Sequence, residues 1–175
     1  MKGFRLLGAA LALLIIAVIG AALVERKRLT AFTTWLQHAW TYSAKVKRSA
    51  KLLADRGLDA DAKARFGRVN AAWVARGHDP LVITSGYRSP EENARVGGAK
   101  RSQHLRGLAF DVYVYFLSRQ ERRALIQLAQ AHGFRGFGVG WTTIHMDRGR
   151  RRAWGYATSS GGARPPKWAR DLFKR

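Results

Sequence analysis

An unbroken run of apolar and small residues near the N-terminus restricts the possible folds more than any other feature. From Leu6 to Val24 the chain carries no charged or strongly polar side chain, and a helix of roughly 20 such residues is long enough to cross a bilayer. A soluble amphipathic helix needs a polar face, which this run lacks. The run therefore predicts a transmembrane helix, with residues 1–28 forming an anchor with basic flanks.

A cleaved signal peptide is the alternative for this segment. Its start is basic, but no good small-x-small cleavage site precedes a polar mature start. The positive-inside rule does not orient the span, because Lys2 and Arg5 before it are nearly balanced by Arg26, Lys27 and Arg28 after it. We expect an uncleaved single-pass anchor whose orientation follows from the function of the domain behind it.

The composition limits the partners and the type of metal site. The 175 residues carry 32 Lys and Arg against 11 Asp and Glu, a net charge of +21, which favours a polyanion such as nucleic acid, anionic lipid or an acidic wall polymer. The chain has no cysteine, so a bound metal must be held by nitrogen and oxygen ligands. The length allows one compact domain with appendages.

Behind the anchor we expect a juxtamembrane helical linker at residues 29–60, a globular domain at 61–150 and a basic extension at 151–175. The extension is rich in cations and contains paired prolines, so it has little means of forming a core by itself. Hydrophobic periodicity and capping signals predict both helices and strands in the domain, hence an α+β fold. The expected elements are helices at 61–76 and 118–132 and strands at 81–84, 109–114, 137–139 and 143–146.

Three segments of this domain together contain the groups that a metal site requires. They are Ile83-Thr-Ser-Gly-Tyr-Arg-Ser-Pro90, Ser102-Gln-His104-x6-Asp111 and Ile144-His145-Met-Asp147. A catalytic zinc takes three protein ligands and keeps one open position, and imidazole and carboxylate are both suitable. His104, Asp111 and His145 supply that set, and neighbouring strands are close enough for their side chains to converge. On spacing alone, a hydrogen-bonded His–Asp pair remains an alternative.

The three segments, in this order, resemble the zinc D-Ala-D-Ala peptidases. This family includes D,D-carboxypeptidases, vancomycin-resistance dipeptidases and phage L-alanyl-D-glutamate endolysins, and its fold is similar to that of the Hedgehog signalling domain. The resemblance runs from about Lys63 to Arg150. It implies a small antiparallel sheet with flanking helices and a Zn²⁺ ion held by His104, Asp111 and His145.

The resemblance also assigns substrate-binding residues. Arg88 matches the arginine that approaches substrate or transition-state oxygen in this family, and a guanidinium suits a carboxylate or a developing oxyanion. Tyr87 belongs to the same motif, and Ser102 matches the motif serine beside the first ligand.

The motifs do not identify the general base. Better-known family members place Glu or His shortly before the last histidine, where this chain has Trp141, Thr142 and Thr143. Asp147 and His132 are the candidates. Asp147 lies on the same strand face as His145, so it is also a candidate for orienting that ligand or for pairing with an arginine.

These observations favour a zinc metallopeptidase that hydrolyses peptidoglycan stem peptides or cross-links by a metal-activated water. We expect a bacterial inner-membrane protein whose domain faces the periplasm or wall, with anionic lipids or wall polymers as possible partners. A virion-associated phage lysin fits equally well. The alternative is a non-catalytic module that only binds wall peptides or a partner. Nucleic-acid binding is the least favoured reading, since no nucleic-acid motif accompanies the charge.

Overall fold

The computed structural model describes residues 24–26, 44–156 and 161–174. In these ranges no helix is both long and apolar enough to cross a membrane. The predicted span lies outside the described residues apart from Val24, so it stays a prediction. The folded unit begins at Lys45, earlier than expected, because residues 45–53 form a helix that joins the domain. Ser49 on this helix is buried, and its Oγ accepts a hydrogen bond from the Ile83 N–H at 3.0 Å.

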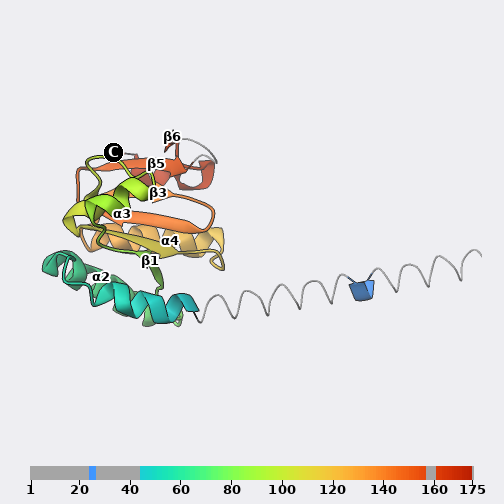
Figure 1. Ribbon diagram of the computed structural model, residues 1–175. Helices are drawn as coiled ribbons and strands as arrows, with labels where there is room; N and C mark the ends of the chain where they lie inside the picture. Colours follow the sequence, from blue (N-terminus) through green and yellow to red (C-terminus); the bar gives the residue numbers. More distant parts are fainter. Residues whose placement is uncertain (1–23, 27–43, 157–160, 175) are drawn as a thin grey trace, which may run out of the picture. The chain divides into compact units, whose positions relative to one another are not determined.

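A six-stranded sheet organises the domain (Figure 1), in the order β1-β2-β4-β3-β5-β6. The described chain also contains helices, so the predicted α+β class is confirmed. Listed along the chain, the strands are β1 (Ile83–Ser85), β2 (Ala109–Tyr113), β3 (Gly136–Val139), β4 (Thr143–Asp147), β5 (Arg152–Tyr156) and β6 (Gly161–Ala163).

The expectation of an antiparallel sheet is wrong at one pair, because β3 and β5 run parallel. Strand β4 lies between β2 and β3, so both of its edges are already paired. The chain leaving β4 reverses direction and joins the sheet at the free edge of β3. A strand that arrives there from β4 must run parallel to β3.

Two long helices begin where their capping residues predict. Helix α2 (Ala60–Val74) starts at Asp59, whose side chain accepts from the Ala62 N–H at 2.8 Å. It ends at Val74, two residues before the expected end at Arg76. Helix α4 (Arg119–Ala131) starts with a capping box between Ser118 and Glu121 and is followed by Gly133, whose φ of 88° suits glycine. A short helix, α3 (Pro90–Arg95), was not expected. It follows Ser89, which caps it.

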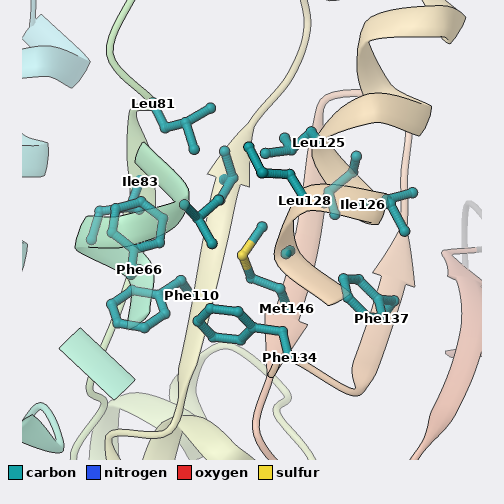
Figure 2. Packing of buried hydrophobic residues seen from close by; sticks show 14 of the residues in the cluster. Phe66, Leu81, Ile83, Phe110, Leu125, Ile126, Leu128, Phe134, Phe137 and Met146 are labelled. Atoms are coloured by element: carbon teal, nitrogen blue, oxygen red, sulfur yellow. The ribbon is translucent and has the colours of Figure 1, made fainter. Parts of the chain in front are cut away.

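The hydrophobic core fills the space between one face of the sheet and helices α2 and α4 (Figure 2). Alternate residues of each strand point to this face, as the period of two in a strand requires. Phe110 from β2 and Met146 from β4 are opposite one another in the sheet and are fully buried. Helices α2 and α4 contribute Phe66 and Leu125 to the same cluster. The intervening strand residues, Asp111 and His145 among them, therefore point to the other face.

Residues after Arg150 form part of the folded unit, in contrast to the extension expected at 151–175. Figure 1 shows β5 beside β3, with β6 beyond it. The 3₁₀ helix η2 (Lys167–Phe173) packs against α4. There Asp171 forms a two-bond ion pair with Arg123, and the ring of Phe173 lies 5.6 Å from that of Phe137. The sequence did not predict these contacts, because the segment is rich in cations and because each of its apolar side chains packs against a partner far away in the sequence.

Candidate metal centre

Three different elements bring the predicted ligands to one place on the sheet face opposite the core. His104 lies on the 3₁₀ helix η1 (Gln103–Arg106), which Ser102 begins by accepting a hydrogen bond from the His104 N–H at 3.3 Å. Asp111 and His145 are directly opposite one another on β2 and β4. His104 and His145 are almost completely buried. The sheet register therefore fixes two ligands, and the capped turn fixes the third.

The three side chains present one atom each to a common centre. His104 Nε2 lies 3.1 Å from His145 Nδ1 and 3.2 Å from Asp111 Oδ1, and the last two atoms are 2.9 Å apart. Donors at about 2.0 to 2.2 Å from a tetrahedral ion are themselves about 3.3 to 3.6 Å apart. A small outward movement of a few tenths of an ångström would therefore fit the three atoms around zinc.

Hydrogen bonds on the outer side of both imidazoles fix their tautomers. His104 Nδ1 lies 2.5 Å from the carbonyl oxygen of Gly86, and His145 Nε2 lies 2.8 Å from Asp147 Oδ2. Since both partners only accept, each of these nitrogens carries the proton. His104 Nε2 and His145 Nδ1 then direct bare lone pairs at the centre, as Asp111 Oδ1 does. Three convergent acceptors repel one another unless a cation lies among them, so this arrangement suits a metal ion.

The ionisation of these groups also favours positive charge at the centre. Burial alone would raise the pKa of Asp111, but hydrogen bonds and charge from His104 and His145 hold it well below its usual value. Burial alone would lower the pKa of His145, but Asp111 and Asp147 raise it overall. Both shifts show that a proton or a metal ion is stabilised among these atoms.

Asp147 lies behind His145 rather than at the centre. Its side chain has no exposed surface. Oδ2 accepts from His145 Nε2, Oδ1 accepts from the Gly149 N–H at 2.7 Å, and Arg152 donates to both oxygens at 2.9 and 2.6 Å. Because both oxygens are engaged on the far side of the imidazole, Asp147 is placed to orient His145 and not to take a proton from water.

The remaining predicted residues divide into those at the centre and those away from it. Arg88 donates to Asp111 Oδ2 at 2.5 Å and to Ser85 Oγ at 2.8 Å. Tyr87 lies against the backbone of Gly57, where a Cβ would approach its ring to 2.3 Å, and it does not line the groove above the centre. His132 ends helix α4 and is also outside the groove.

An open groove of about 1290 Å³ leads to the three convergent atoms. Among the described residues that line it, the three ligands provide all of the imidazoles and carboxylates. Sequence reasoning missed the aromatic wall formed by Trp154 and Tyr156 on β5, which lies outside the motifs. The lining also has five arginines, namely Arg88, Arg101, Arg106, Arg150 and Arg152.

Comparison with known proteins gives two matches to this region. The model of the family described as peptidase M15 matches residues 44–147, which include all three convergent side chains. The zinc D-Ala-D-Ala carboxypeptidase of Streptomyces albus G is 36% identical over 75 residues, equal to 43% of this chain and 28% of that enzyme. The chain thus matches little more than a quarter of that relative's length. Strand β5 lies beyond the family match.

Proposed function

Because the chain belongs to the peptidase M15 family, with the match at residues 44–147, we propose that it is a zinc-dependent peptidase that hydrolyses peptide bonds in peptidoglycan. The family resemblance predicted from the three motifs is thereby confirmed. The observation that carries the proposed activity is the convergence of three lone pairs, from His104, Asp111 and His145, at the base of an open groove.

The described residues would have different roles in such a site. His104, Asp111 and His145 would hold the zinc, and their outer hydrogen bonds keep both imidazoles in the ligating tautomer. Bound zinc polarises a carbonyl group and lowers the pKa of a bound water to about 7. Arg88 lies beside Asp111 and faces the groove, where its guanidinium is placed to bind a carboxylate or a developing oxyanion.

The groove favours a peptide that carries several carboxylates. Arg101, Arg106 and Arg150 line it, are exposed, and make no ion pair within the described part of the chain. Peptidoglycan stem peptides contain such acidic groups, and the relative from Streptomyces albus G is a D-Ala-D-Ala carboxypeptidase. A terminal D-Ala-D-Ala bond and an internal stem-peptide bond are both compatible with the open groove.

We also propose that the apolar run at residues 6–24 holds this domain at a bacterial inner membrane, with the groove facing the periplasm or wall. The net charge of +21 supports an attraction to anionic lipids or wall polymers. Membrane fractionation of the tagged full chain, with alkaline washing to remove peripheral proteins, tests the anchor. Recovery of the chain in the soluble fraction would contradict it, and a virion-associated lysin would then be the better reading.

Digestion of purified peptidoglycan tests the activity. The full chain is incubated with zinc, with a chelator, and with the substitution His104→Ala, and released products are identified by mass spectrometry. We expect zinc-dependent release of a defined peptide or amino acid, lost with the chelator and in the variant. The masses of the products identify the bond that is cut.

One observation favours a second candidate, a module that binds wall peptides without cutting them. Among the described lining residues there is no carboxylate or imidazole besides the three ligands, so a conventional general base is missing from the groove. Binding of one zinc per chain and of peptidoglycan, with no product released over long incubation, would favour this candidate over the peptidase.

A further inference from the structure

Alternate glycines on β3 and directly after it make room for side chains from β5. Alternate residues of a strand share one face, and the parallel pairing places Gly136 and Gly138 beside large residues of β5. Gly140 follows the last residue of β3 and lies against a third. An added Cβ at any of these glycines would meet the β5 side chain at 2.2 to 3.1 Å. The three rows are Gly136 with Arg152, Gly138 with Trp154, and Gly140 with Tyr156.

The glycines allow the β5 side chains to reach across β3 to the metal centre on β4. In the first row, Arg152 passes over Gly136 and binds Asp147. In the second row, the Trp154 ring lies 5.2 Å from the His145 ring, and a Cβ at Gly138 would approach the indole to 2.7 Å. These contacts make β5 one wall of the centre, although β5 lies beyond the residues matched by the family model.

In the third row, Tyr156 packs over Gly140 and lines the groove together with the three ligands. The Trp154 and Tyr156 rings lie edge to face, with centroids 6.2 Å apart and an interplanar angle of 75°. Trp154 therefore supports the Tyr156 ring on the wall of the groove.

Tyr156 lines the same groove as the three ligands, and its surroundings keep its hydroxyl group protonated. Although 48% of the Tyr156 surface is exposed, burial of its hydroxyl end raises the pKa, and the charges of Asp111 and Arg88 act on it in opposite directions. At neutral pH the residue is therefore a neutral phenol. Such a group is a hydrogen-bond donor and not a base.

We propose that Tyr156 donates a hydrogen bond to the oxygen of the scissile carbonyl, where negative charge develops during hydrolysis. Tyr156 is thus a catalytic residue supplied by β5, on the wall of the groove formed by Trp154. It provides an uncharged phenol donor on the wall of a groove that is also lined by five arginines. This inference rests on the proposed peptidase function.

The substitution Tyr156→Phe tests the inference because it removes only the hydroxyl and keeps the ring over Gly140. Loss of one oxyanion donor typically lowers kcat about 10²- to 10³-fold, and we expect a decrease of this size with KM within about threefold of the wild type. Zinc affinity stays unchanged. A phosphinate analogue of the cleaved bond, whose P–O⁻ group stands in for the developing oxyanion, binds more weakly by a similar factor.

Tyr113→Phe is the matched control. Tyr113 lies on β2, does not line the groove, and packs under Lys45, so its hydroxyl is remote from the substrate. The control keeps wild-type kcat. If Tyr156→Phe also keeps wild-type kcat and phosphinate affinity, or if its loss of activity comes with loss of zinc, the inference is wrong. If the wild type itself cleaves nothing, the proposed function fails first.

Discussion

Replacement of Asp147 by asparagine should weaken zinc binding although Asp147 does not touch the ion. Its two oxygens accept four hydrogen bonds, from His145, from the Gly149 N–H and two from Arg152. Asparagine keeps the shape but turns one oxygen into an amide donor. The amide NH₂ group must then face an N–H group of His145, Gly149 or Arg152, and Arg152 loses its charged partner. His145 is held less firmly, and its imidazole becomes a poorer ligand.

Loss of such an orienting partner typically weakens metal binding 10- to 100-fold, which corresponds to about 1.4 to 2.8 kcal/mol. Because Asp147 is completely buried and is bound by three residues, we expect Asp147→Asn to lie toward the upper end of this range. Competition for zinc between the protein and a chromophoric chelator at neutral pH measures the change in Kd.

The matched control is Asp171→Asn. Asp171 also forms a two-bond pair with an arginine, Arg123, at 2.8 and 2.6 Å, but it lies on η2 away from the centre and is half exposed. This variant should bind zinc as the wild type does. Equal zinc affinities of Asp147→Asn and the wild type, or an equal loss in both variants, would refute the orienting role.

Two further predictions concern the same part of the sheet. Gly138→Ala places a Cβ 2.7 Å from the Trp154 ring, so the indole must move. We expect the unfolding free energy, measured with urea, to fall by about 1 to 3 kcal/mol, and zinc binding, measured by chelator competition, to weaken. Unchanged values of both would show that β5 shifts to make room for the Cβ without cost. For the pH dependence, burial would raise the pKa of Asp147, but His145 and Arg152 lower it from 3.8 to about 2. A lowered pKa stabilises the fold above pH 3.8, and this contribution, about 2 kcal/mol, disappears as the pH falls toward 2. Urea unfolding of the metal-free wild type from pH 5 to 2 should show this slope, and Asp147→Asn should lack it; parallel curves would contradict the assignment.

The three ligands could be located from the sequence because the order of the three motifs resembles that of a known family, whereas spacing alone also allowed a His–Asp pair. The structure shows the local signals that place them. A capped turn presents His104, and the alternation of apolar residues on β2 and β4 requires that Asp111 and His145 point away from the core. The capping box of α4 was also readable, since its two members are three residues apart.

The contribution of β5 could not be predicted in the same way. Its side chains Arg152, Trp154 and Tyr156 alternate in the sequence, but the space that they occupy is created by two glycines on β3 and one directly after it. A glycine in a strand suggests a close approach without identifying what approaches. The charged residues and prolines around β5 favoured an extended tail when each was considered without its partner.

The glycine row also affects how the domain assembles. Before β5 docks, Gly136 and Gly138 on β3 have no side chains to pack against neighbours, and glycine weakens a strand. Strand β3 therefore depends on a segment that is synthesised after it. Because β5 supports His145 through Trp154, and supports Asp147 through Arg152, docking of β5 and binding of zinc each favour the other. By thermodynamic linkage the two effects are equal in size, so zinc in the centre would stabilise the C-terminal edge of the sheet, and detachment of this edge would weaken zinc binding by the same factor.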